Sequence, residues 1–192
     1  YVSLRDGADA FSGLAAHGFV RGILSTGGQP TALTGEVITS NYFDVLGVPP
    51  VLGRAFPADE NGAEGQHPVV VLSHGLWQSR FGGRPDILGQ AVELSGVSYT
   101  VVGVARAGYT GTVPGLETQF WVPVMMVERL NFQGIQSDQE RGPGSTRIEK
   151  RGQRWLFVKG RLAEGRTFEQ ARAQVETVMA RLRTEFPLTN EK

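Results

Sequence analysis

The chain has 192 residues, and its 19 lysines and arginines balance 19 aspartates and glutamates, so its formal net charge is zero. This balance argues against a general nucleic-acid-binding protein, which needs an excess of positive charge to displace the counterions of the phosphates. The chain has no cysteine, which excludes disulfides, cysteine-ligated zinc, iron–sulfur clusters and a thiol nucleophile. A composition with 40% hydrophobic and 20% charged residues is that of an ordinary globular protein.

The chain shows no sign of its own membrane anchor or leader. A bilayer-spanning helix needs about 20 apolar residues, but the longest apolar run is about Phe120 to Val127, and Pro123 interrupts it. The first residue is Tyr1, and no signal-peptide pattern follows it. We therefore expect both ends to be cut from a longer protein that carries any targeting or membrane segments.

The first quarter of the chain is expected to form a helix and a hairpin. Apolar residues at steps of three and four predict a helix over Ser3–His17, which Gly18 can end. Two strands, Phe19–Leu24 and Thr31–Thr39, flank a loop that contains glycine and proline. Such a loop favours a hairpin.

The middle of the chain is expected to be rich in short strands. Before it, Ser40 or Asn41 can cap a short helix over Tyr42–Leu46, which Gly47 ends. The predicted elements that follow are strands at Val69–Leu72, Gln90–Leu94, Tyr99–Ala105 and Gln119–Val124, a hairpin turn at Ser95–Ser98, a helical turn that Ser73 caps and Gly82-Gly83 ends, and a weak helix at Met125–Leu130.

The last quarter carries the strongest local signal. Gln136–Arg151 is almost devoid of apolar residues and predicts a solvated loop. A strand is expected from Trp155 to about Ala163. Thr167 and Gln170 have the spacing of a capping box, and the apolar residues behind them predict an amphipathic helix from Phe168 to about Phe186.

These elements predict an α+β fold with two lobes. Residues 1–48 and 152–192 share a helix-and-strand character and are expected to form one discontinuous lobe, a small sheet covered by two helices. Residues 49–151 are expected to form a β-rich mixed lobe that is inserted between them.

The residues with reactive side chains do not form a recognisable active site. His17 is expected near a helix end, either solvated or interacting favourably with the helix dipole, and His67 lies in a polar loop. Ser73 and His74 are adjacent and raise the possibility of a nucleophile and base, but no nucleophile-elbow motif is present and Ser73 is better explained as a helix cap. The histidine spacing does not match a zinc site, and the glycines do not form a phosphate-binding loop, so we expect no catalytic, metal or cofactor site.

Other polar and aromatic residues also favour structural roles. Asp59 and Glu60 are expected in a solvated turn. Trp77, Trp121 and Trp155 each lie among apolar residues and are expected to pack in the core. A locally basic segment contains interleaved acids, which favours a solvated loop over an anion site; its basic residues are Arg141, Arg147, Lys150, Arg151 and Arg154.

Short motifs in the sequence are more informative about function than its composition. A set of short motifs runs along the chain: residues 37–48 (VITSNYFDVLGV), 52–56 (LGRAF), 69–77 (VVVLSHGLW), 80–83 (RFGG), 86–90 (DILGQ), 99–105 (YTVVGVA), 120–123 (FWVP), 155–158 (WLFV) and 161–165 (RLAEG). In this order they resemble the periplasmic core domain of MacB/FtsX-type ABC transporter permeases. The resemblance covers nearly the whole chain, and the wording is most similar to the permeases common in acidobacteria, which are often encoded without a fused ATPase.

The resemblance implies a fold and a set of signature residues. The terminal lobe would be the porter-like α/β lobe of the family, the middle its inserted (Sabre-like) lobe, and a last porter strand would follow Lys192. No catalytic residue of the family lies in this domain. The signature positions, which we expect to be structural, are Asn41, Tyr42, Phe43, Leu46, Gly47, Trp77, Phe81, Gly82, Gly83, Gly103, Trp121 and Pro123.

The resemblance also implies a function. The domain would lie on the periplasmic side of the inner membrane and transmit ATPase-driven motion, in contact with partner proteins or substrate, in export, lipoprotein handling or cell-envelope regulation. Its partners would be a cytoplasmic ABC ATPase coupled through flanking membrane helices, a periplasmic adaptor and a second permease. Two alternatives stay open: a module that captures an amphiphilic ligand between its lobes, and a serine hydrolase acting through Ser73 and His74.

Overall fold

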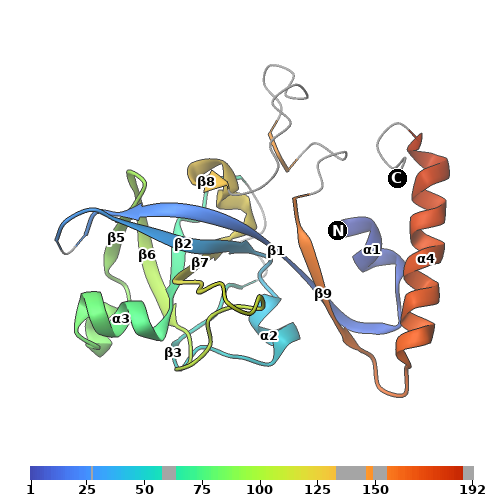
Figure 1. Ribbon diagram of the computed structural model, residues 1–192, viewed down its shortest axis with the longest axis horizontal. Helices are drawn as coiled ribbons and strands as arrows, with labels where there is room; N and C mark the ends of the chain where they lie inside the picture. The colour runs from blue at the N-terminus through green and yellow to red at the C-terminus, as the bar shows by residue number, and fades with distance from the viewer. Residues whose placement is uncertain (27, 58–63, 133–145, 149–154, 188–192) are drawn as a thin grey trace.

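The structure, a computed structural model, describes residues 1–26, 28–57, 64–132, 146–148 and 155–187 (Figure 1). In chain order the helices (α, and η for 3-10) and strands (β) are α1 Val2–Gly7, β1 Phe11–Leu24, β2 Thr31–Ile38, α2 Tyr42–Leu46, β3 Leu52–Gly53, β4 Val69–Leu72, α3 His74–Phe81, η2 Pro85–Ile87, β5 Ala91–Leu94, β6 Val97–Val104, β7 Phe120–Pro123, η3 Val124–Arg129, β8 Asn131–Phe132, β9 Phe157–Leu162 and α4 Phe168–Glu185.

The predicted α+β class is confirmed, and its strands form one mixed sheet. Hydrogen bonding follows the order β2-β7-β4-β6-β5-β1, and β1 also pairs with β2, so six strands close into a ring. The pairs β2–β7 and β4–β6 are parallel, whereas the other four pairs of the ring are antiparallel. Of the remaining strands, β3 is added to β6, and both β8 and β9 are added to β1.

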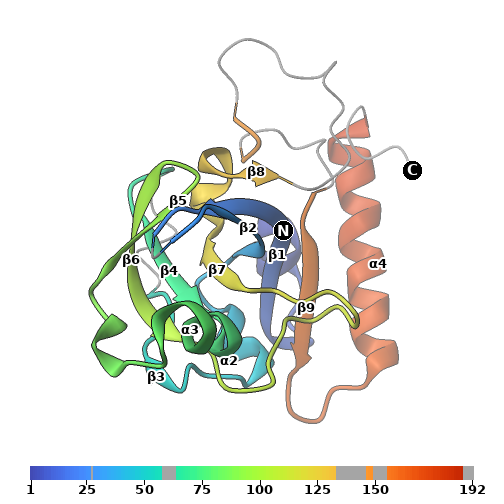
Figure 2. The ribbon, with the colours of Figure 1, turned by 60° about the vertical axis from the view of Figure 1, so that its left-hand side comes forward.

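Strand β1 is 14 residues long and joins the ring to the end of the chain. Its residues Phe11–His17 pair with β9, and His17–Leu24 pair with β2. Figure 1 shows β1 running from the side of α4 to the hairpin at the opposite end, and Figure 2 shows β9 between the ring and α4.

The predicted helix over Ser3–His17 is therefore wrong beyond Gly7. Residues 14–18 of β1 are buried without alternation, because elements pack on both faces of the strand. Ala15 and Ala16 are fully buried there. Burial on both faces removes the period-two pattern that identifies a strand, and the apolar residues that remain fell at helical spacing.

Three predictions that rested on local signals are confirmed. Ser73 caps α3, since its Oγ accepts a hydrogen bond from the Leu76 N–H at 3.1 Å. The capping box at α4 is complete: the Gln170 N–H donates to Thr167 Oγ1 at 3.3 Å, and the Thr167 N–H donates to Gln170 Oε1 at 3.0 Å. The β5–β6 hairpin is also present, with a turn at Ser95 and Gly96 that is two residues long.

Helix α4 covers the start of β1 from outside the ring. It buries Ala171, Val178 and Leu182 and packs beside α1. Gln174 fastens it to the strand, because its Oε1 accepts a hydrogen bond from the Ala10 N–H at 2.8 Å and its Nε2 donates to Asp9. No helix in the described ranges is long and apolar enough to span a membrane.

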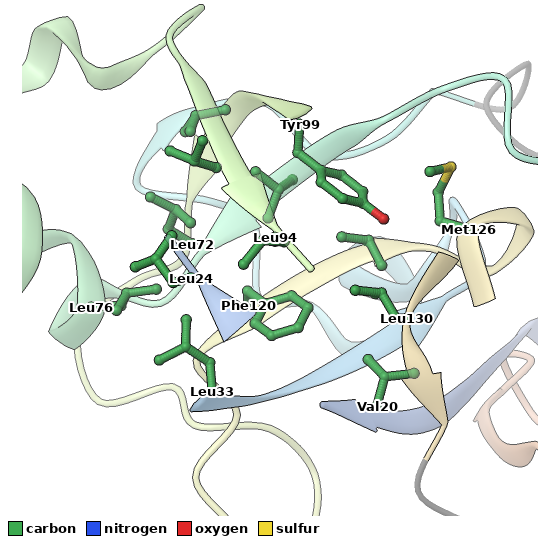
Figure 3. Close-up of a cluster of buried hydrophobic side chains, with 14 of the residues drawn as sticks. Val20, Leu24, Leu33, Leu72, Leu76, Leu94, Tyr99, Phe120, Met126 and Leu130 are labelled. Atoms are coloured by element: carbon green, nitrogen blue, oxygen red, sulfur yellow. The ribbon is translucent and has the colours of Figure 1, made fainter. Parts of the chain in front are cut away.

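Two hydrophobic clusters stabilise the fold. The larger contains Val20, Leu24, Leu33, Leu72, Leu76, Leu94, Tyr99, Phe120, Met126 and Leu130 (Figure 3). The smaller lies beneath α2 and joins Ala15 of β1, Tyr42 and Phe43 of α2, and Trp121 of β7. The prediction that the tryptophans pack in the core is confirmed, because Trp121 is fully buried and Trp77 and Trp155 pack against the larger cluster.

Two predicted loops fall mainly on residues that the structure does not describe. Asp59 and Glu60 lie outside the described ranges, as do Arg141, Lys150, Arg151 and Arg154 of the basic segment. Of Gln136–Arg151 the structure describes residues 146–148. Within these, Arg147 is only 6% exposed, and its N–H donates to Glu128 Oε1 at 2.7 Å, so the prediction of a solvated loop is wrong for this residue.

The packing inside the ring predicts the effect of adding one methyl group. A Cβ at Gly35 of β2 would lie 2.3 Å from Cζ of the fully buried Phe120, whereas a Cβ at Gly75 of α3 would have no atom closer than 3.9 Å. We expect Gly35→Ala to lower the free energy of unfolding by about 1–3 kcal/mol through overpacking. Gly75→Ala should leave it unchanged or raise it by up to about 1 kcal/mol, since alanine favours helix.

Urea denaturation of the two variants beside the native chain measures both effects. Equal stability of the two variants would contradict the packing described for the ring.

Candidate functional site

A cluster of polar side chains lies buried where β1, β2, α2 and the β6–β7 connection meet. Its centre is Glu36 of β2, which is fully buried. Thr118 donates a hydrogen bond to Glu36 Oε1 at 2.6 Å, and Tyr42 of α2 donates one to Oε2 at 3.0 Å. Tyr109 in turn donates to the Tyr42 hydroxyl at 3.0 Å.

His17 of β1 completes this cluster. Its side chain is fully buried, so the expectation of a solvated histidine near a helix end is wrong. Nδ1 lies 3.1 Å from Glu36 Oε2, close enough for an ion pair but not aligned for a hydrogen bond, and Nε2 lies 3.3 Å from Thr112 Oγ1. The rings of Phe19, Tyr42 and Phe157 lie within 5.8 Å of the imidazole, centroid to centroid.

The backbone of the β6–β7 connection, residues 105–119, comes very close to this pair. Gly111 has φ +103°, and a Cβ there would lie 2.7 Å from both Glu36 Oε1 and Thr118 Oγ1. The position therefore needs glycine both for its backbone conformation and for space. Nearby, the rings of Tyr109 and Trp121 are stacked, with their centroids 5.5 Å apart.

The electrostatics of the cluster determine the direction of its hydrogen bonds. Burial, followed by the negative charge of Glu36, raises the pKa of Tyr42 far above its ordinary value. Burial raises the pKa of Tyr109 to about 12. Both phenols consequently stay protonated near neutral pH, so they act as donors and Glu36 acts as the acceptor.

The order hydroxyl, imidazole, carboxylate from Thr112 through His17 to Glu36 is that of a hydrolase triad. A hydrolase also needs an open path by which substrate reaches the base. His17 and Glu36 are both fully buried, so this arrangement does not present a base to a substrate.

Ser73 and His74, the serine–histidine pair that the sequence suggested, do not form such a series of hydroxyl, imidazole and carboxylate. Ser73 Oγ is engaged at the start of α3. His74 packs edge-on against Trp77, with 5.3 Å between ring centroids, and in the part of the chain that is described it makes no hydrogen bond or ion pair with an acid. His67 lies half-buried before β4. No group of three or more potential metal ligands occurs among the described residues.

The signature residues gather in the two hydrophobic clusters. Tyr42, Phe43 and Trp121 form the smaller cluster, and Leu46 packs against it. Trp77 and Phe81 pack against the larger one. The remaining positions are at the ends of elements or within strands: Gly47 ends α2, Gly82 and Gly83 follow α3, Gly103 lies in β6 and Pro123 ends β7.

Asn41 has a different role from the one that we expected. It occupies the N-cap position of α2, but its side chain makes no capping hydrogen bond. Its Nδ2 instead donates to the Leu14 carbonyl at 2.8 Å, and its Oδ1 accepts from Thr39 Oγ1 at 2.8 Å. Asn41 thereby fastens the start of α2 to β1.

Sequence reasoning did not single out Glu36, Tyr109, Thr112 or Thr118. One signal was available for Glu36: it is the only charged residue within an apolar strand, Leu33–Ile38. Buried charges need a partner, so such a glutamate indicates one elsewhere in the chain. The partner, His17, was hidden because its strand was predicted as a helix.

Comparisons with known proteins agree on one family. A family model described as the MacB-like periplasmic core domain matches residues 3–178. Among curated proteins, the "Probable export ATP-binding/permease protein MacB" of Pseudomonas entomophila (strain L48) is 30% identical over 86 residues, which cover 45% of this chain and 13% of that protein.

Solved structures share the fold at low identity. The periplasmic region of MacB from Actinobacillus actinomycetemcomitans superposes with a TM-score of 0.66 at 16% identity, over 98% of this chain and 75% of that one. The extracellular domain of the noncanonic ABC-type transporter YknZ from Gram-positive bacteria gives a TM-score of 0.52 at 21% identity, over 72% of this chain and 74% of that one.

Two buried tyrosines allow the contribution of the polar cluster to the free energy of unfolding to be measured. The hydroxyl of Tyr42 joins Tyr109 to Glu36, whereas the buried hydroxyl of Tyr99 has no hydrogen-bond partner among the described residues. We expect Tyr42→Phe to lower the free energy of unfolding by about 1–3 kcal/mol, because Glu36 loses a donor. Tyr99→Phe should be neutral or stabilising.

Thermal and urea unfolding of both variants check this prediction. A loss of stability in Tyr99→Phe as large as that in Tyr42→Phe would contradict it.

Proposed function

Since the chain belongs to the MacB-like periplasmic core domain family of ABC transporter permeases, we propose that it transmits ATPase-driven motion of the membrane helices to partner proteins or substrate. As a member of this family it is an extracytoplasmic domain of a permease. The observation that carries the proposal is the family match over residues 3–178. Export, lipoprotein handling and cell-envelope regulation are the processes that we propose for it.

The architecture supports a mechanical role. A ring of six strands around a packed core resists deformation, because every strand of the ring is hydrogen-bonded to a neighbour on each side. Strand β1 continues from this ring to β9 and α4 without interruption. A displacement at the chain ends can therefore reach the ring through a single hydrogen-bonded strand.

We also propose the two-lobed division of the family, with residues 1–48 and 152–192 in a porter-like lobe and 49–151 in an inserted β-rich lobe. Its support is that α1 and α4, from opposite ends of the chain, pack side by side. Strand β9 likewise pairs with the first half of β1, across about 145 residues of sequence. The β1–β2 hairpin, which pairs with strands of both segments, would be the joint between the lobes.

The partners and the absence of catalysis are proposals as well. We propose a cytoplasmic ABC ATPase reached through flanking membrane helices, a periplasmic adaptor protein, and a dimer of permeases, of the type that acidobacteria encode without a fused ATPase. We propose no catalytic, cofactor or metal site in this domain. The supporting observation is that His17 and Glu36, the imidazole and carboxylate of the triad-like arrangement, are both fully buried.

Capture of an amphiphilic ligand is the alternative function. The described residues offer an open pocket of about 410 Å³ beside the β5–β6 turn. Its lining is mixed and consists of Ile23, Ser25, Ser95, Gly96, Glu128, Arg129 and Leu130. Pockets for amphiphiles are predominantly apolar. This lining therefore favours motion transmission over ligand capture.

Spin-label distance measurements on the full-length permease with its ATPase test the proposal. The chain has no native cysteine, so Arg183→Cys on the exposed side of α4 gives one label in each domain. We expect the distance between the labels of the two permeases to differ between the nucleotide-free and ATP-bound states, because the domains follow the membrane helices.

A second site on the opposite side of the fold, Ser98→Cys in β6, should report the same transition. An ATPase that cannot bind ATP should abolish it at both sites. An unchanged distance at both sites would contradict motion transmission, and the absence of any distance between labels would contradict the dimer.

A further inference from the structure

The ring is closed by six seams, each the line along which two neighbouring strands pair, and the seam between β1 and β5 is the shortest. It has a single pair of opposed residues, Leu24 and Leu94, whereas β1 and β2 are paired over His17–Leu24. We infer that the ring opens at the β1–β5 seam and that the hydroxyl groups of Ser95 and Thr26 form the clasp that keeps it closed. The inference concerns the chain itself and stands independently of the proposed function.

The β1–β5 seam has only half of the backbone hydrogen bonds of a regular ladder. In an antiparallel ladder, the residues on either side of a non-hydrogen-bonded pair exchange two N–H···O=C bonds. Here the Ser95 N–H donates to the Ile23 carbonyl at 2.9 Å, and the Ser25 N–H donates to the Glu93 carbonyl at 3.0 Å. In the described structure neither bond is returned by a backbone carbonyl.

Two side-chain hydroxyls take the place of the carbonyls. The Ile23 N–H donates to Ser95 Oγ at 3.1 Å, and the Glu93 N–H donates to Thr26 Oγ1 at 2.8 Å. The carbonyl of Ser95 does not continue the ladder because the β5–β6 turn begins at this residue. Ser95 has φ +52° and is the one residue other than glycine with a positive φ in the described ranges. Two backbone bonds and two hydroxyl bonds therefore close the ring.

The flanks of the β1–β5 seam are open to water. Ile23 is 45% exposed, and Glu93 is also exposed. Hydrogen bonds in such a place contribute little to stability, because water replaces the partner when the bond breaks. The next shortest seam, β4–β7, has two residue pairs, and its four residues are at most 1% exposed. Opening therefore breaks the fewest and the most exposed bonds at the β1–β5 seam.

The rest of the ring stays paired when this seam opens. Strand β1 keeps its ladder with β2, and β5 keeps its ladder with β6. The Arg80 side chain also holds the β1–β2 loop to α3, since its Nη2 donates to the Gln29 carbonyl at 3.0 Å. Leu24 and Leu94 are fully buried in the larger cluster, so the closed ring remains the dominant state. Opening converts the ring into an open sheet that begins at β5 and ends at β1.

Hydrogen exchange of the 192-residue chain, followed residue by residue by NMR, measures this opening. Four amides bond across the seam, those of Ile23, Ser25, Glu93 and Ser95. We expect each to be protected at least tenfold less than the amide of Val101, which bonds across the β5–β6 seam. Their protection factors should be similar, because one local opening exposes all four. Protection equal to that of Val101 would overturn the inference.

Two variants test whether the hydroxyls act as a clasp. Ser95→Ala removes the acceptor of the Ile23 amide, and Thr26→Val removes the acceptor of the Glu93 amide. We expect either change to speed exchange about two- to tenfold at all four seam amides, because each weakens the same closed state. Faster exchange at only the amide that lost its acceptor would show independent fraying and would overturn a concerted opening.

Thr100→Val is the matched control. Thr100 lies exposed in β6, and its hydroxyl makes no hydrogen bond in the part of the chain that is described. We expect exchange of the four seam amides to change by less than about twofold in this variant, since no bond across the seam is lost. An acceleration as large as that in Thr26→Val would overturn the role of the clasp.

Discussion

The fold depends on one long strand that serves two sets of partners. The first half of β1 pairs with β9 and the second half with β2, and His17 is the residue at which the partner changes. Because β1 is continuous, the register of β2 in the ring also determines where β9 and α4 lie outside it. A break in β1 would separate the chain ends from the ring while leaving most of the ring's other strand pairs in place.

The same change of partner creates the conditions for the polar cluster. Where β1 leaves one neighbour for the other, both of its faces are covered, and His17 becomes fully buried. A buried histidine needs a polar partner, and β2 supplies Glu36 from the neighbouring strand. The β6–β7 connection then completes the cluster with hydroxyl groups. Strand pairing and the polar cluster are therefore two consequences of one geometry.

The features that were predicted correctly from the sequence are those that depend on only a few neighbouring residues. The cap at Ser73, the capping box at Thr167 and the β5–β6 hairpin depend on neighbours along the chain, and each is present, although the hairpin turn is two residues long and not four. The prediction for β1 was wrong because contacts outside its own segment make it a strand. It pairs with β9, which is distant in sequence, and α2 packs on its second face. The prediction for His17 was wrong for the same reason. Residues that are distant in sequence bury its side chain, so the sequence around it gives no signal of this burial.

The position of the β6–β7 connection, residues 105–119, allows it to move without breaking the ring. The connection is fixed at its two ends by backbone hydrogen bonds, from the Ala105 N–H to Leu72 and from the Gln119 N–H to Thr34. Opening of residues 106–118 breaks side-chain hydrogen bonds and the stacking of Tyr109 on Trp121, but no bond of the strand ladder. Local opening of this kind requires less free energy than global unfolding. A stiff ring can thus carry a segment that side-chain contacts, and not strand pairing, hold against it.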